Sequence, residues 1–415
     1  MIATRIFALG VLFLGVLGTA AISVAEGGKV AATNSNQFGC DLLHRLAEKE
    51  QGNLFFSPYS VETALTMTYG GARGQTAQEM ARVLHLNQYV KGTDADVFGD
   101  FKALTDSINN AGLSGKDRVF DLVVANALWA QKGLDLEPTY LKLVKDQFAG
   151  QLDQVDFAAG GASLEQARST INDWVAKQTN DKIKDLLSKE ALGADTRLVL
   201  TNAIYFKGAW LTPFSKKATQ EEAFHAVAGD VNVSMMHEKH IFQYTDNADV
   251  QVVSLPYKSN RMSMVVVLPR KADALPKIEQ ALDTKTIDGW VQGMGGQQVD
   301  LSLPKFTFSS HFALGQVLKT MGMEIAFSNH ADFSGITKST DQSLCIGEVV
   351  HQAFVDVNEE TTEAAGATGI MMHPTAMPVM LEPVVFKADH PFLFVIRDNE
   401  NGAILFIGRV ANPKG

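Results

Sequence analysis

The stretch from Val349 to Met380, VVHQAFVDVNEETTEAAGATGIMMHPTAMPVM, constrains the fold more than any other part of the sequence. Up to Val357 it alternates in the way that predicts a β-strand. Thr361 to Gly369 then contains only Thr, Glu, Ala and Gly. Alone, such a run indicates a flexible loop. It is also slim enough to fit between two neighbouring strands, because it carries no side chain large enough to anchor a core.

Three strand-like segments follow this run, at Val384–Ala388, Phe392–Arg397 and Ala403–Val410. A long pliable loop that is fixed to sheet at both ends is unusual in a compact domain. Loops of this kind generally have a functional role. We therefore expect the run to carry the activity of the protein.

Residues 358–367 of this stretch read NEETTEAAGA. Six further segments are NLFFSPYSV (53–61), TNAIYFKGAW (201–210), LPKF (303–306), ADFSGI (331–336), DHPFLFVIRD (389–398) and ILFIGRVANP (404–413). In this order the segments resemble the serpins, a family of serine protease inhibitors, and 358–367 is similar to the hinge of the serpin reactive-centre loop. They extend from about residue 35 to the C-terminus, so the resemblance covers nearly the whole chain.

The order of strand and helix patterns fits no βαβ repeat and predicts an α+β fold. The resemblance implies a serpin-like fold with three β-sheets, eight or nine helices and an exposed reactive-centre loop at about 359–380. It also implies that the largest sheet opens to admit this loop. Because no linker or internal repeat divides the chain, we expect one domain over 26–415.

The resemblance assigns roles to individual residues. It implies a loop hinge made of Glu359, Glu360, Thr361, Thr362, Glu363, Ala364, Ala365, Gly366 and Ala367. Glu359 would pair with Lys305 beside Trp210. Under the sheet that opens, it implies a polar cluster of Ser57, Ser60, Asn202 and His351. Each of these four residues could instead have an ordinary structural role, as a helix cap, a hydrogen-bonded buried amide or a core histidine.

Counting from Glu359 as in inhibitory serpins places the cleaved bond at Thr375–Ala376. Met372–His373 is a weaker alternative, and Met377–Pro378 is poor because proline after the cleaved bond impedes cleavage. The span from Thr361 to Phe386 contains no Lys or Arg. We therefore expect a target protease of elastase-like or subtilisin-like preference.

Alternate side chains of an inserted strand face the core. From Thr362 the inward residues are all uncharged: Thr362, Ala364, Gly366, Thr368, Ile370 and Met372. Glu363 falls on the outward set. This alternation, with uncharged residues facing inward and Glu363 facing outward, favours an inhibitory loop. Thr361 departs from the glycine that serpins usually place there, and a β-branched residue stiffens the hinge.

The N-terminus is typical of a secretory signal, with Arg5, an apolar run from Ile6 to Leu17 and a small-residue end at Ala25. We expect 1–25 to be a signal peptide and the protein to be secreted, extracellular or periplasmic. Without residues 1–25 the chain has 35 basic and 46 acidic residues and a net charge of −11. This charge argues against nucleic-acid and anionic membrane partners.

Motifs of catalysis and cofactor binding are absent from the sequence. It has no G-x-S-x-G elbow and no phosphate-binding loop, so we expect no enzyme and no cofactor. His237 and His240 do not have the HExxH zinc spacing, and we expect a solvated strand or turn there. A helix over 94–110 carries only Lys102 as a base among several acids, which argues against activation by heparin.

Three function classes remain open at this stage. The leading one is a secreted, monomeric inhibitor that traps a serine protease as a covalent acyl-enzyme. The alternatives are a non-inhibitory serpin that binds or helps fold a partner, and a hydrolase. We expect Cys40 and Cys345 to be buried, unpaired thiols. Asn232 begins an N-glycosylation sequon, which is modified only in a host that glycosylates its proteins.

Overall fold

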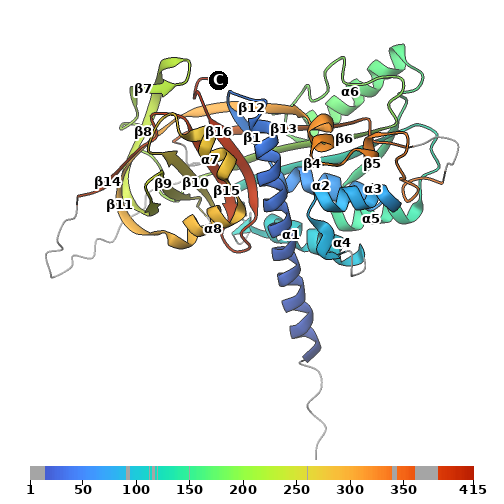
Figure 1. The fold of residues 1–415 in the computed structure, drawn as a ribbon, viewed down its shortest axis with the longest axis horizontal. Helices are drawn as coiled ribbons and strands as arrows, with labels where there is room; N and C mark the ends of the chain where they lie inside the picture. Colours follow the sequence, from blue (N-terminus) through green and yellow to red (C-terminus); the bar gives the residue numbers. More distant parts are fainter. Residues whose placement is uncertain are drawn as a thin grey trace, which may run out of the picture.

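The computed structural model describes residues 15–89, 94–111, 113–114, 117–118, 120–148, 150–258, 260–338, 344–359 and 382–415. Within these ranges helices and strands are mixed along the chain, so the expected α+β class is confirmed (Figure 1). The helices are α1 (Gly15–Ala47), α2 (Pro58–Tyr69), α3 (Gly74–Val83), α4 (Asp94–Ala111), α5 (Pro138–Phe148), α6 (Gly161–Gln178), α7 (Leu275–Ala281), α8 (Thr284–Gly293) and α9 (Gly315–Thr320). Short 3₁₀ turns lie at Leu86–Tyr89 and Ile325–Phe327.

Helix α1 is longer than the pattern at Asn34–Gln51 suggests, and its N-terminal turns extend away from the body (Figure 1). From Gly28 onward it packs on α4, where a Cβ at Gly28 would lie 3.4 Å from the backbone nitrogen of Leu104. The expected signal cleavage after Ala25 lies within this helix, just before the packed part. No helix in the described ranges is long and apolar enough to cross a membrane.

Helix starts show where local sequence signals succeed and fail. Ser57 caps α2, since its hydroxyl accepts a hydrogen bond from the Ser60 N–H at 3.1 Å, as Ser-Pro predicts. The capping box that Thr76 and Glu79 suggest for α3 is wrong. Both side chains instead accept backbone N–H groups of the distant segment 325–332.

A nine-stranded sheet contains the C-terminal strands. Its order is β1 (Leu54–Phe56), β16 (Ile404–Val410), β15 (Phe392–Asp398), β10 (Met262–Pro269), β9 (Val250–Pro256), β8 (Gly229–Asp246), β11 (Gly295–Pro304) and β14 (Val384–Lys387), with β7 (Gln220–Ala226) also paired to β8. β10 is buried along its whole length, as its unbroken apolar run predicts. β14 is a short edge strand that pairs in parallel with β11.

A five-stranded sheet crosses the middle of the molecule. Its order is β12 (Phe306–Ala313), β13 (Glu348–Val357), β6 (Leu198–Gly208), β4 (Phe120–Gln131) and β5 (Gln151–Val155). The sequence suggests one strand over Gln298–Phe308. The structure divides it at Lys305, because β11 and β12 belong to different sheets. A ribbon of β2 (Leu113–Ser114) and β3 (Asp117–Arg118) makes the third sheet.

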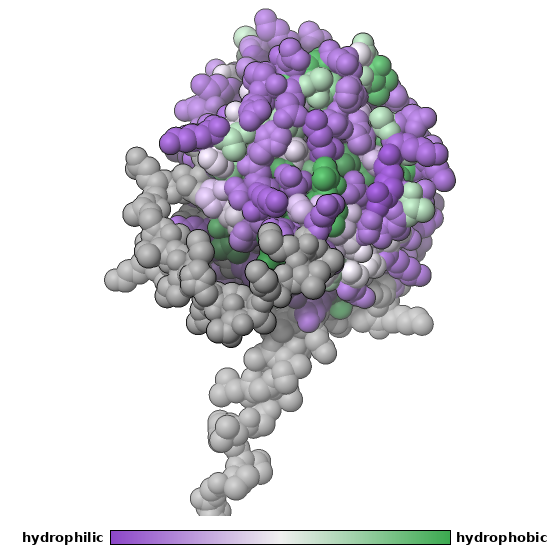
Figure 2. Space-filling model, turned by 90° about the vertical axis from the view of Figure 1, so that its left-hand side faces the viewer, coloured by the Kyte–Doolittle hydropathy of each residue, from purple (hydrophilic) through white to green (hydrophobic). Residues whose placement is uncertain are grey.

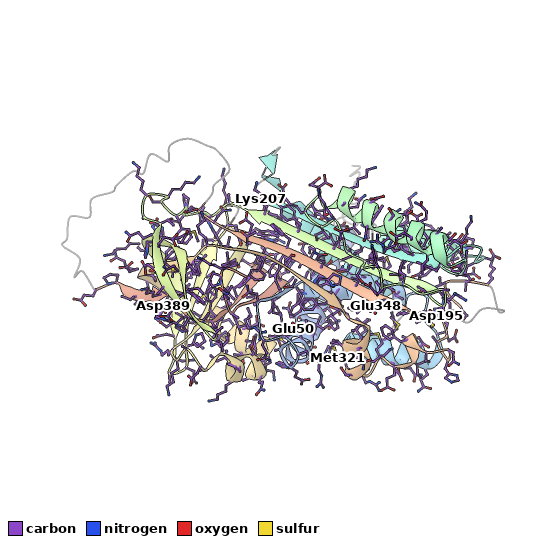
Figure 3. All side chains as sticks on the ribbon, turned by 90° about the horizontal axis from the view of Figure 1, so that it is seen from above. Glu50, Asp195, Lys207, Met321, Glu348 and Asp389 are labelled. Atoms are coloured by element: carbon purple, nitrogen blue, oxygen red, sulfur yellow. The ribbon has the colours of Figure 1, made fainter. Side chains whose placement is uncertain are left out.

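The five-stranded sheet is covered on both faces. α2 packs on one face, together with the main hydrophobic core that includes Leu200 and Ile204. α6 covers part of the other face over a smaller core around Trp129 and Ile171. Figure 3 shows the long strands between α6 and the helices below them. A strand added to this sheet would therefore enter a buried layer.

The chain ends that flank 360–381 belong to β13 and β14. β13 is a strand of the five-stranded sheet, which is not the sheet with the most strands. The loop therefore continues from a sheet that is not the largest by strand number, and the expectation that a sheet opens to admit it stays a prediction. The face on the side of β7 and β14 is mainly hydrophilic with scattered apolar residues (Figure 2).

Candidate functional site

The candidate site is the boundary between β13 and β6. These neighbours run parallel, with His351 opposite Asn202, whereas β13 pairs antiparallel with β12 on its other side. The chain continues from Val357 to Glu359, and the next described residue after that is Glu382, just before β14. The two ends of 360–381 are therefore attached to different sheets.

Glu359 is held where the chain leaves β13. Its carboxylate oxygens accept hydrogen bonds from Lys305 Nζ at 2.8 Å and from Thr219 Oγ1 at 2.7 Å. Burial acts to raise the pKa of Glu359, but the hydrogen bonds from Lys305 and Thr219 outweigh it and lower the pKa below the usual value. The side chain is thus an ionised anchor, although only 6% of it is exposed.

Trp210 supports the same turn. Its indole N–H donates to the Asn358 carbonyl at 2.9 Å, and its ring stacks on Tyr257 with centroids 4.6 Å apart. The structure therefore brings Glu359, Lys305 and Trp210 together. Thr219, the other donor to Glu359, lies in an irregular segment, and no sequence pattern marks it.

Replacing Lys305 with alanine is expected to destabilise this turn. The carboxylate of Glu359 would lose a charged donor while staying buried, so we expect the free energy of unfolding to fall by about 1–2 kcal/mol. Urea unfolding measures this. Lys338→Ala is the matched control, because its amine lies 3.8 Å from Glu137 and is 53% exposed; it should change stability by less than about 0.5 kcal/mol. Equal losses in both variants would contradict the prediction.

A polar cluster lies across the inner face of the same strands. His351, Asn202 and Asn126 are register neighbours on β13, β6 and β4. The Asn202 amide donates to the Ser60 carbonyl at 2.8 Å and also contacts Asn126 Oδ1. Ser57 donates its backbone N–H to His351 Nε2 at 3.1 Å. All four residues that the resemblance assigns to this cluster are thus in contact through hydrogen bonds.

Asn126 is the member that sequence reasoning missed. It stands on the same face of β4 as Leu128 and Ala130, which lie in the main core. A polar residue within an apolar alternation was the available signal. Its amide oxygen also accepts the Ser60 hydroxyl at 3.3 Å, so β4 and α2 are joined through it.

His351 is neutral, and its tautomer follows from its partners. A backbone N–H can only donate, so Nε2 accepts from Ser57 and the proton resides on Nδ1, which donates to Asn202 Oδ1. Burial lowers the pKa of His351 to about 3. The ring also stacks on Phe312. The cluster therefore joins β13 to β6 and α2 without any charge.

Acid is expected to weaken the fold through His351. The unfolded chain binds a proton at this residue near pH 6.5, and the folded protein only near about 3. Stability is therefore fully present above 6.5 and falls as the pH falls below it, by up to about 1.4 kcal/mol per pH unit. His351→Gln should flatten this slope in unfolding measured against pH. His330→Gln, at an exposed site, should retain it; the same slope in both variants would refute the assignment.

The remaining predicted loop residues lie outside the described residues. These are the hinge residues Glu360, Thr361, Thr362, Glu363, Ala364, Ala365, Gly366 and Ala367, and the bond between Thr375 and Ala376. Their assignments stay predictions.

Other candidate groups have structural partners. His237 lies on β8 with Nε2 2.8 Å from Glu222, and His240 lies on the same strand. In the described part of the chain no cluster of three or more His, Cys, Asp or Glu residues could hold a metal ion. Both cysteines are free thiols; Cys40 is buried as expected, while Cys345 is partly exposed.

A sequence profile described as "Serpin (serine protease inhibitor)" matches residues 33–413. This chain is a serpin. It is 43% identical over 390 residues to an uncharacterized serpin-like protein of Thermococcus kodakarensis, covering 94% of this chain and 87% of that one. It is 38% identical over 385 residues to the leukocyte elastase inhibitor of Xenopus laevis, covering 91% and 97%.

A solved structure matches this serpin over nearly its whole length. Human thyroxine-binding globulin matches this serpin with a TM-score of 0.82 at 28% identity, covering 94% of this chain and all of that one. The serpin fold is therefore established here by sequence and by structure. Family membership supports a protease inhibitor rather than an enzyme.

Proposed function

We propose that this serpin inhibits a serine protease as a suicide substrate. The protease serine Oγ attacks the carbonyl carbon of Thr375. The bond to Ala376 breaks, the amine leaves with a proton, and an ester joins the enzyme to the loop. The freed segment then enters the sheet between β13 and β6 and carries the enzyme with it before water hydrolyses the ester.

The observation that carries this proposal is the parallel pairing of β13 with β6 directly before the loop. A segment that turns back after Glu359 runs antiparallel to both strands. Insertion would replace one parallel ladder by two antiparallel ladders, which are slightly more stable per residue. About a dozen added backbone hydrogen bonds, at about 1 kcal/mol each, would stabilise the molecule by an amount comparable with the whole stability of an ordinary domain.

The geometry also identifies what must rearrange. The hydrogen bond between His351 and Asn202 crosses the boundary that has to open. Ser57, the cap of α2, hydrogen-bonds to His351 of β13, and Ser60 of α2 hydrogen-bonds to Asn202 of β6. A sixteen-residue strand over 360–375 spans about 50 Å at about 3.3 Å per residue. This distance is enough to move a protease from one end of the sheet to the other.

The target follows from the loop sequence. Since Thr361 to Phe386 contains no Lys or Arg, we propose an elastase-like or subtilisin-like enzyme. Similarity to a relative named as an inhibitor of leukocyte elastase supports this choice. We also propose that the protein is secreted after cleavage behind Ala25 and acts as a monomer, in keeping with the hydrophilic face in Figure 2.

Incubation with pancreatic elastase, subtilisin and trypsin in parallel tests the proposal. We expect a complex that resists SDS with one of the first two and none with trypsin. Mass spectrometry of the released C-terminal fragment should show that it begins at Ala376. A cut after Lys387 or Arg397 would remove the assignment of the bond.

The second candidate is a non-inhibitory serpin that binds a partner. The presence of thyroxine-binding globulin among its structural neighbours favours it as the alternative. Such a protein would be cleaved without complex formation and would gain no thermal stability on cleavage. The melting experiment in the Discussion separates the two candidates.

A further inference from the structure

Glu62 carries a carboxyl group that is buried inside the core. It lies on α2, its side chain is fully buried, and neither oxygen has a partner in the described part of the protein. An ionised carboxylate in such a place loses its hydration without compensation. Nothing in the proposed inhibition uses this residue, so its state requires a separate explanation.

Two more unpartnered polar atoms belong to residues near Glu62. Thr66 follows one turn later on α2, and Ser35 is on α1. Both hydroxyls are fully buried without a hydrogen-bond partner among the described residues. Burial raises the pKa of Glu62 well above its usual value, and the neighbouring Ser35 hydroxyl, although outside regular hydrogen-bond geometry, acts to lower it. The three side chains thus form a buried polar group between the two helices.

The helices approach closely beside this group. A Cβ at Gly39 of α1 would lie only 2.6 Å from Pro58 of α2, so their backbones meet there. Ser35 is one turn from Gly39, and Glu62 is one turn from Pro58. We call this contact the α1–α2 seam, defined by Ser35, Gly39, Pro58, Glu62 and Thr66. Because it is tight, an added charge cannot be hydrated without separating the helices.

No charged side chain shifts the pKa of Glu62 from any element packed on α2. Several charged residues on those elements are paired elsewhere: Asp41 with His85, His44 with the Leu282 carbonyl, Arg45 with Glu48, Arg82 with the Gly322 carbonyl, Lys102 with Asp106, Lys142 with Asp146, and Arg409 with Glu279. Lys29 of α1, Asp121 of β4, Lys145 of α5 and Lys207 of β6 are exposed. His351 of the sheet is neutral. A counterion therefore does not stabilise an ionised Glu62.

We propose that Glu62 carries a proton in the folded protein and that the α1–α2 seam is a proton-linked switch, closed by the neutral acid and opened by its ionisation. A neutral carboxyl supplies one O–H donor, which suits the unpartnered hydroxyl oxygen of Ser35. Ser57, which caps α2, and Ser60 within α2 bind His351 of β13 and Asn202 of β6. Opening the seam is therefore expected to loosen these contacts as well. This inference does not depend on the proposed inhibition.

The sign of the pH dependence follows from linkage. An acid whose pKa is raised by folding stabilises fully below its unfolded pKa of 4.5, and this stabilisation is lost as the pH rises towards the folded pKa. Glu62→Gln keeps the shape of the neutral acid but cannot ionise. The unfolding equilibrium constant of the wild type, divided by that of Glu62→Gln, should rise about tenfold per pH unit above 4.5 until Glu62 ionises in the folded protein.

Urea unfolding of the full chain between about pH 5 and about pH 8 measures this ratio. Glu190→Gln is the matched control, because it makes the same charge change at an exposed site. Its ratio to the wild type should stay constant. A constant ratio for Glu62→Gln as well would overturn the proposal.

A second measurement needs no variant that might fail to fold. Infrared spectroscopy of the wild type at neutral pH should show the carbonyl band of a protonated carboxyl group, and this band should disappear in alkali together with amide-exchange protection of α1, α2 and the β13–β6 pair. Absence of the band at neutral pH would overturn the proposal. Its loss in alkali with unchanged protection would overturn the switch.

Discussion

Arginine in place of Thr362 is expected to turn this protein from an inhibitor into a substrate. In an inserted strand Thr362 belongs to the set that faces the core, beside side chains of the main hydrophobic core. A guanidinium there would be desolvated without a partner, at a cost of several kcal/mol. Insertion would slow below the rate of ester hydrolysis, so the protease would be released. Gel analysis should show cleaved protein accumulating with little or no SDS-resistant complex.

Glu363→Arg is the matched control, because it places the same side chain one position along, on the outward set. There the charge stays in water, and we expect inhibition to persist. If both variants inhibit equally, the inserted strand does not have the alternation proposed here. If both fail, the hinge tolerates no arginine at all, and the proposed alternation loses its support.

Cleavage of the loop is expected to raise the melting temperature more than any substitution would. About a dozen new hydrogen bonds, at about 1 kcal/mol each, would stabilise the nicked molecule by about 10 kcal/mol. At about 2 °C per kcal/mol this predicts an increase of roughly 20 °C. Scanning calorimetry before and after limited proteolysis with subtilisin measures the shift directly.

The Thr362→Arg variant, nicked at the same bond, provides the control for this experiment. Its cut segment should stay outside the sheet, so its melting temperature should remain near that of the intact protein. An unchanged melting temperature in the nicked wild type would exclude insertion. The protein would then be the non-inhibitory serpin of the second candidate, with its family membership unaffected.

Much of the fold could be predicted because strand alternation is a local signal. The pattern over Phe120–Gln131 matches β4 to the residue, and the apolar run at Met264–Leu268 lies in fully buried β10. The Ser57-Pro58 start of α2 was equally local. At the candidate site the resemblance to serpins, rather than any local pattern, supplied Lys305 and Trp210, which the structure places beside Glu359 and Asn358.

The parts that sequence reasoning missed depend on distant contacts. A continuous strand pattern passes through Lys305, but the chain changes sheets there. Thr76 and Glu79 have the spacing of a capping box, yet a segment about 250 residues away takes their oxygens. Asn126 joins the site through the register of strands far apart in sequence, and Thr219 joins it through a side-chain contact from an irregular segment. The sequence predicts only that Glu62 lies on a helix, and its burial is visible only in the structure.

The attachment of β13 and β14 to separate sheets has a consequence for how such an inhibitor is used up. Once the peptide bond between its two halves is cut and the upstream half has paired on both sides, no step returns the molecule to its starting form. Each copy therefore works once. The quantity of protein supplied, and not an equilibrium affinity, would set how much protease can be removed.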